Sequence, residues 1–124
     1  MYIDQGSQPV DTSPMEYAQR VRDLGAGEIF LNSIDRDGMA DGYDIDIIKN
    51  ISQAVNIPVI ACGGAGFFDD FVDVFKKTGA SAAAAGNIFN FTENAYRNAK
   101  KELIEAGCQV RPFIGKQVLE EKLK

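Results

Sequence analysis

The chain has 124 residues, 13 Lys and Arg against 18 Asp and Glu, and a formal net charge of −5 at pH 7. This length suits one domain with a single core, and the negative charge argues against nucleic acid or a membrane surface as partner. The absence of histidine excludes the usual nucleophile–base pairs and zinc sites. With no apolar run of membrane-spanning length, no secretory signal and no metal-type cysteine spacing, we expect a cytoplasmic protein without metal or other cofactor.

The first part of the chain predicts an extended segment followed by a helix. Residues 1–12 contain several turn formers and predict an extended or hairpin segment. Ser13, Pro14 and Glu16 form a helix start, because the serine and glutamate make a capping box and proline suits the first helical position. Gly25 is expected to end this helix. The predicted inward stripe is Tyr17, Ala18, Val21 and Leu24.

Three runs, at 28–33, 57–62 and 80–85, predict strands. The first has a continuous apolar centre, which is expected of a strand that is covered on both faces. Helices are predicted between them at 44–55 and 68–78. The inward residues of these helices are expected to be Ile47, Ile48, Ile51, Val55, Phe71, Val74 and Phe75.

The region after the third strand predicts a short turn at 86–89 and a last helix. Thr92 is expected to cap this helix, which runs to about residue 106, and Gly107 to end it. The tail, 108–124, is charged toward its end. We therefore expect three parts: an N-terminal segment at 1–12, a domain at 13–107 and a C-terminal tail at 108–124.

Helices that alternate with strands through short connections predict an α/β fold with parallel strands. A (βα)8 TIM barrel needs about 250 residues, so the chain corresponds to half of such a barrel. A three-stranded parallel segment has two open edges and an uncovered inner face. We therefore expect two copies to form a homodimer, or the chain to associate with a missing N-terminal half.

Two glycine-bearing loops follow the second and third predicted strands. Gly63, Gly64 and Ala65 lie in the first loop, and Gly86 and Asn87 in the second. Small residues let main-chain N–H groups approach an anion closely, and a (βα)8 barrel holds phosphate in the loops after its last two strands. Either loop alone is explained equally by a tight turn. Two loops on adjacent strands favour a phosphate site and a phosphorylated small-molecule substrate.

Polar residues at the end of the first predicted strand are further candidates. Asp37, in the loop at 35–42, is placed to act as a base or to anchor a substrate hydroxyl, or else belongs to a solvated loop in which Arg36 pairs with a carboxylate. Asn32 and Ser33 either contact substrate or satisfy buried backbone groups. Glu28 lies at the opposite, N-terminal end of the same strand, where a surface ion pair is the alternative.

Five motifs arrive in an order and spacing that resemble the C-terminal half of the cyclase subunit of imidazole glycerol phosphate synthase. They are Gly25-Ala26-Gly27-Glu28-Ile29, Ser33-Ile34-Asp35-Arg36-Asp37-Gly38, Gly42-Tyr43-Asp44, Ala61-Cys62-Gly63-Gly64-Ala65-Gly66 and Ala84-Ala85-Gly86-Asn87-Ile88-Phe89. The resemblance implies a (βα)8 barrel that takes ammonia from a glutaminase partner. It closes an imidazole ring on a substrate with two phosphate groups, in histidine biosynthesis.

The resemblance also implies roles for single residues. Asp37 matches a substrate-binding aspartate, Glu28 matches a charged gate over the ammonia passage, and the backbone cradle for one phosphate is matched by Gly64, Ala65, Gly86 and Asn87. The two catalytic aspartates of the family lie in the half that this chain lacks. We therefore expect little or no cyclase activity from this polypeptide alone, which leaves open whether it is an enzyme by itself.

A paralogous branch of the same family is the close alternative. Its members pair with a glutaminase-like partner and help to amidate the sugars of surface polysaccharides, such as lipopolysaccharide. Cys62 and Gly86 stand where the histidine enzymes more often have serine and alanine. Two further interpretations are a non-catalytic phosphate-binding half-barrel and an unrelated open α/β domain whose glycines serve only turns.

Overall fold

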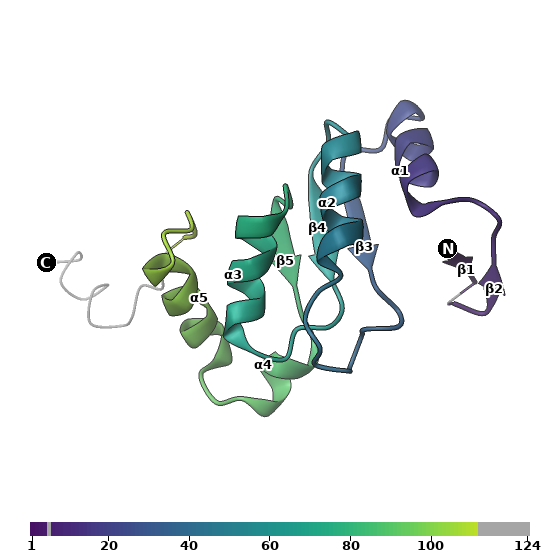
Figure 1. Ribbon diagram of the computed structural model, residues 1–124. Coiled ribbons are helices and arrows are strands. Elements are labelled where there is room, and N and C mark those ends of the chain that lie inside the picture. Colours follow the sequence, from purple (N-terminus) through teal and green to yellow (C-terminus); the bar gives the residue numbers. More distant parts are fainter. Residues whose placement is uncertain (5, 112–124) are drawn as a thin grey trace, which may run out of the picture.

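The structure, a computed structural model, describes residues 1–4 and 6–111, and the predicted tail lies outside it from residue 112 on (Figure 1). Helices and strands alternate along most of the chain. In chain order they are β1 (Tyr2–Ile3), β2 (Gln8–Pro9), α1 (Pro14–Asp23), β3 (Ile29–Asn32), α2 (Ile45–Ala54), β4 (Val59–Cys62), α3 (Phe68–Lys77), β5 (Ala82–Ala84), α4 (Asn87–Phe91) and α5 (Ala95–Glu105).

Strands β3, β4 and β5 form a parallel sheet in that order, which confirms the predicted α/β fold. In the register, Asn32 pairs with Cys62, and Cys62 pairs with Ala84. The carboxyl ends of the three strands are therefore level, and the loops that follow them leave the sheet at one edge. Strands β1 and β2 form a separate antiparallel pair at the N-terminal end of the molecule (Figure 1).

The helices α2 and α3 lie on one face of the sheet, with α1 beside α2 and α5 beside α3 (Figure 1). Alternation along each strand decides which side chains this layer covers. In β4, Val59 and Ala61 are buried, whereas Ile60 and Cys62 are only half-buried. The buried core side chains are Ala18, Tyr43, Ile48, Ile51, Val55, Val59, Ala61, Phe71, Val74, Ile88, Ala95, Ala99 and Leu103.

The start of α1 follows the predicted capping box. The Ser13 hydroxyl accepts a hydrogen bond from the Glu16 N–H at 3.1 Å, and the Ser13 N–H donates to Glu16 Oε2 at 3.1 Å. These two bonds satisfy donors that a helix start otherwise leaves open.

The predicted cap at Thr92 is wrong. Residues 87–91 form the short helix α4 instead of a turn, and the Thr92 N–H donates to the Ile88 carbonyl as this helix ends. Asn94, in the left-handed region at φ 55°, then begins α5. The local preference of threonine for a helix start is therefore overridden by its place at the end of the preceding helix.

Three of the residues predicted to point inward are exposed. Tyr17 is 42% exposed, Leu24 78% and Ile47 38%, whereas Ala18 and Ile48 beside them in sequence are buried. Apolar periodicity identifies a face of a helix, but it does not say which part of the chain covers that face. Tyr17 and Ile47 line a hollow next to the edge strand β3.

Candidate functional site

The two glycine loops emerge together at the carboxyl edge of the sheet. Because Cys62 pairs with Ala84, Gly64 and Gly86 each stand two residues beyond paired strand ends. Gly63 and Gly64 have φ of +92° and +107°, a region that L side chains rarely adopt. In the part of the chain that the structure describes, the amides of Gly64 and Gly86 donate no hydrogen bond. Gly64 is buried against Gly42, whereas Gly86 is exposed. An anion site requires main-chain donors that no other group of the protein occupies, and both loops contain one.

The loop that carries Asp37 folds back toward this edge. The Asp37 N–H donates to the Ser33 carbonyl at 2.9 Å, and a Cβ on Gly38 would lie 3.5 Å from Asn87 Nδ2. Burial, and after it the charge of Asp37, raises the pKa of the Cys62 thiol. Asp37 is therefore close to the end of β4, and the following glycine is close to the start of α4.

Asn32 and Ser33 lie against the first glycine loop. A Cβ on Gly63 would stand 2.6 Å from the Ser33 carbonyl oxygen and 3.0 Å from Asn32 Oδ1, so only glycine fits there. The Ser33 N–H donates to the Cys62 carbonyl at 3.0 Å. The backbone of Ser33 thus continues the sheet, while the exposed Asn32 side chain is accessible at the same edge.

Glu28 does not join this group. It is exposed and precedes β3, at the amino end of the sheet, so the length of the strand separates it from the glycine loops. Arg36 has the structural role that the sequence offered as an alternative, since it pairs with groups of its own loop. Its Nη1 donates to the carbonyls of Asp41 and Gly42, at 3.3 Å each, and its Nε is 3.9 Å from Asp44 Oδ2.

Two residues at this edge were missed by the sequence reasoning. Tyr43 is buried, and its hydroxyl donates to the Ala84 carbonyl at 2.8 Å, which ties the loop after β3 to the end of β5. Burial, with Cys62 and Asp70 nearby, raises the pKa of Tyr43. Asp70 accepts hydrogen bonds from the amides of Gly66 and Phe67. Asp70 could have been found from its position three residues after Phe67 and next to a glycine loop, because an acidic residue there can accept hydrogen bonds from the start of a helix.

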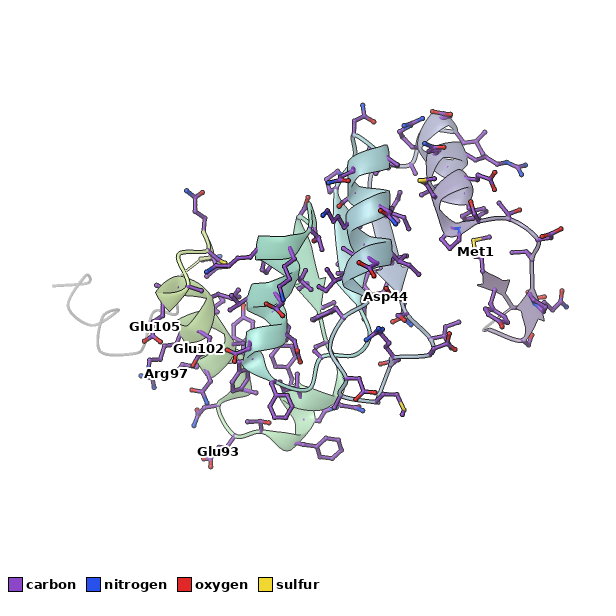
Figure 2. The ribbon with its side chains drawn as sticks, viewed as in Figure 1. Met1, Asp44, Glu93, Arg97, Glu102 and Glu105 are labelled. Carbon is purple, nitrogen blue, oxygen red and sulfur yellow. The ribbon has the colours of Figure 1, made fainter. Side chains whose placement is uncertain are left out.

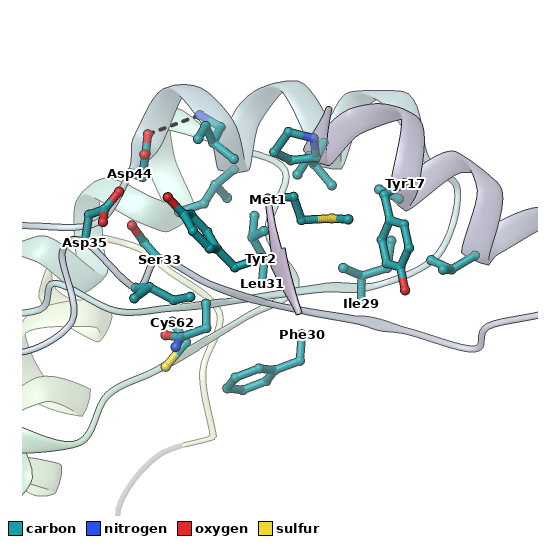
Figure 3. Close-up of a pocket in the computed structure, with 18 of the residues that line it drawn as sticks. Met1, Tyr2, Tyr17, Ile29, Phe30, Leu31, Ser33, Asp35, Asp44 and Cys62 are labelled. Atoms are coloured by element: carbon teal, nitrogen blue, oxygen red, sulfur yellow. Dashed lines mark hydrogen bonds between the residues drawn. The ribbon is translucent and has the colours of Figure 1, made fainter. Parts of the chain in front are cut away.

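A hollow lies elsewhere, along the outer edge of β3 (Figure 3). It has a volume of about 840 Å³, and apolar side chains such as Tyr2, Tyr17 and Ile29 line much of it. Asn32, Ser33 and Glu28 also line it, but Gly64 and Gly86 do not. In Figure 3, Phe30 points to the side of β3 opposite Ile29 and Leu31. A second hollow of about 240 Å³, between α3, β5 and α5, also lacks both glycines.

Several charged side chains of the described residues lie far from this edge. Glu93, Arg97, Glu102 and Glu105 lie on or beside α5, at the end of the molecule opposite Met1 (Figure 2). Within residues 1–4 and 6–111, no group of three or more His, Cys, Asp or Glu side chains could hold a metal ion. No helix of the described residues combines the length and apolar character needed to cross a membrane.

Comparison with known proteins now decides the family. The family model described as "Histidine biosynthesis protein" matches residues 1–95. The chain belongs to this family. It is 45% identical to the imidazole glycerol phosphate synthase subunit HisF of Methanopyrus kandleri over 111 residues. These aligned residues cover 90% of this chain and 41% of the relative. The HisF of Alkaliphilus metalliredigens is 46% identical, with 90% and 44% covered.

A third relative is called a putative imidazole glycerol phosphate synthase subunit, hisF2, of Pseudomonas aeruginosa. It is 48% identical over 91 residues, which cover 73% of this chain and 36% of the relative. The chain thus spans about two fifths of the length of the HisF relatives that it matches. The predicted resemblance to this cyclase family is confirmed.

Proposed function

We propose that the chain is the phosphate-binding half of a HisF-type cyclase in histidine biosynthesis. The observation that carries the proposal is that a member of this family brings two glycine loops, with amides that donate to no atom of the described chain, to one edge of its sheet. A phosphate dianion gains strong hydrogen bonds from such amides, since charge-assisted bonds are stronger than neutral ones. The bound group would be one phosphate of a phosphorylated small molecule.

The candidate residues divide into two places along the strands. At the carboxyl edge, Gly63, Gly64, Ala65, Gly86 and Asn87 form the phosphate cradle. Asp37 lies within reach of this edge and binds or supports the substrate, with Asn32 and Ser33 beside it.

At the amino end, Glu28 acts as the gate for ammonia that a glutaminase partner supplies. This separation matches the direction of transfer, because ammonia would enter at one end of the strands and react at the other.

We further propose that the 124 residues by themselves turn over little or no substrate. In this proposal the two catalytic aspartates come from a second polypeptide or region that completes the barrel. The exposed inner face of the sheet supports this, because Phe30 is 60% exposed there. A homodimer would cover the same face without supplying the catalytic groups. The free Cys62 and Cys108 suit a reducing cytoplasm.

A second candidate function is the amidation of surface-polysaccharide sugars by a paralogous synthase. The resemblance at Cys62 and Gly86 favours it, and the thiol of Cys62 lies near Asp37 at the carboxyl edge. Cys62 lies outside the proposed phosphate cradle, so a different residue at this position could change which substrate is bound while the cradle stays the same.

Phosphate binding is tested by titrating the purified chain with inorganic phosphate and following the amide signals of Gly64 and Gly86 by NMR. We expect saturable shifts at both. Gly86→Ala adds a methyl group where no atom lies within 4 Å, so it should leave the fold intact and weaken binding. Gly27→Ala is the matched control, because its Cβ also meets no atom and lies at the amino end. Equal phosphate affinity in both variants would exclude the proposed cradle.

Turnover is tested by assaying imidazole formation from the cyclase substrate with ammonia as nitrogen donor. We expect almost none from the chain alone, and activity after addition of a polypeptide that carries the N-terminal half of a HisF relative. Full activity without that addition would contradict the proposed division of labour. Turnover of an amidation substrate only would support the second candidate function.

A further inference from the structure

Asp70 occupies an unusual position at the start of α3. The main-chain N–H groups of Gly66 and Phe67 both donate to its Oδ2, each at 2.8 Å. Phe67, which begins the helix, has no polar side chain to cap it. The carboxylate of Asp70 therefore satisfies two amides of the glycine loop that would otherwise point outward from the helix start.

The other oxygen of Asp70 faces the loop after β3. A Cβ on Gly42 would lie 3.2 Å from Asp70 Oδ1, so the carboxylate occupies the space beside this glycine. The Gly42 N–H in turn donates to the Gly64 carbonyl at 2.9 Å. Asp70 is thus hydrogen-bonded to the glycine loop after β4, and that loop is itself hydrogen-bonded to the loop that carries Asp37.

The two loops are in contact at backbone level, which leaves them little freedom to move separately. A Cβ on Gly66 would stand 2.5 Å from the Ala40 carbonyl oxygen, and one on Gly64 would collide with the carbonyl of Gly42. Because the loops interlock in this way, the direction of the Gly64 and Ala65 amides depends on the position of Gly66, which Asp70 fixes.

We propose that Asp70 is a positioning residue for the phosphate cradle, an inference that rests on the proposed function. Its hydrogen bonds withdraw the amides of Gly66 and Phe67 from any bound anion and hold those of Gly64 and Ala65 in place. Its negative charge, however, opposes an anion at the same loop. Asp70 therefore acts in two opposite ways, since its bonds strengthen phosphate binding and its charge weakens it.

Two substitutions of Asp70 distinguish the effect of its hydrogen bonds from the effect of its charge. Asp70→Asn keeps an oxygen that can accept both amides and removes the charge, so phosphate affinity should rise by about twofold to threefold. Asp70→Ala removes both bonds and releases the loop, so affinity should fall by about tenfold. Asp69, exposed in the same helical turn, supplies the matched controls. Asp69→Asn and Asp69→Ala remove the same charge without touching the loop, and should change affinity by less than about twofold.

The experiment measures the dissociation constant of inorganic phosphate from the amide shifts of Gly64 and Gly86, in all four variants and the unsubstituted chain. Exchange of the Gly66 and Phe67 amides with deuterium is followed in parallel, and Asp70→Ala should accelerate it. A purely structural cap would lower stability in Asp70→Ala but leave phosphate affinity unchanged in every variant, which would overturn the inference.

A variant that does not fold is replaced by Asp70→Ser, whose short hydroxyl cannot span both amides and should also weaken binding. Binding by Asp70→Ser equal to that of the unsubstituted chain would overturn the inference and leave the proposed phosphate site standing. The absence of saturable shifts in the unsubstituted chain would reject the phosphate site itself, and the role of Asp70 with it.

Discussion

The two faces of the β3–β4–β5 sheet differ sharply in what covers them. On one face, Val59 and Ala61 are almost completely shielded by α2 and α3. On the other, Phe30 is 60% exposed and Ile60 only half-buried. Both faces present apolar side chains, as parallel strands in barrels do. This difference indicates that the apolar burial that stabilises the sheet lies mainly between the sheet and its helices, whereas the opposite face leaves apolar side chains open to solvent.

The strongest test of this comparison removes a side chain of the same class from each side. Ile51→Ala opens a cavity beneath α2, where Ile51 is 2% exposed, and should lower the free energy of unfolding by about 2–5 kcal/mol. Phe30→Ala removes a larger but exposed side chain and should cost less than about 1 kcal/mol in a monomer. Urea unfolding followed by circular dichroism measures both. Equal losses would show that the two faces are equally covered in solution.

Phe30 should matter more for association than for folding. If two copies cover the inner face of each other's sheet, Phe30→Ser removes apolar area from that interface and shifts the equilibrium toward monomer. Analytical ultracentrifugation over a range of micromolar concentrations should show a weaker dimer for Phe30→Ser. Tyr96→Ser is a matched control, since Tyr96 is 58% exposed but lies on α5, where its ring packs beside Phe89 of α4. An unsubstituted chain that stays monomeric would contradict the homodimer.

A smaller effect is expected at the carboxyl edge of the covered face. Tyr43→Phe removes the bond to the Ala84 carbonyl and should cost about 1–2 kcal/mol in free energy of unfolding. The pKa of Tyr43 is raised in the folded chain, so its contribution is complete below the ordinary tyrosine pKa and is lost as pH rises above it. Tyr43→Phe should therefore flatten the alkaline loss of stability. Tyr17→Phe, at an exposed tyrosine, should leave that loss unchanged.

Local sequence predicted most of what lies on the covered face. The strands β3, β4 and β5 and the helices α1, α2 and α3 follow apolar runs and capping patterns that act over a few residues. The wrong predictions concern residues whose burial or helix position depends on contacts with distant parts of the chain. Whether Tyr17 or Ile47 is covered depends on what packs against α1 and α2, and Thr92 ends α4 because that short helix forms at all.

The candidate site divides in the same way. Gly63 and Gly64 could be identified from the sequence because a positive φ and a close backbone approach both require glycine at these positions. Tyr43 could not, because its bond to Ala84 joins residues 41 positions apart and nothing in either neighbourhood predicts it. Asp70 could be noticed in the sequence as an acidic residue in a first helical turn. Its position beside Gly42, a residue of the loop after β3, arises only in the folded chain.

The smallest expected effect concerns α1, which packs on α2 but lies outside the larger core cluster. Its capping box should therefore contribute to stability in a way that acid reveals. Hydrogen bonds from the Ser13 hydroxyl and amide lower the pKa of Glu16. The resulting stabilisation is complete above the ordinary glutamate pKa of about 4.3 and is lost as pH falls through the lower folded value. Glu16→Gln should reduce the loss of stability below about pH 4, measured by thermal unfolding across pH. Glu28→Gln, at an exposed glutamate, should keep the full acid dependence, and an identical change in both variants would show that α1 gains nothing from its cap.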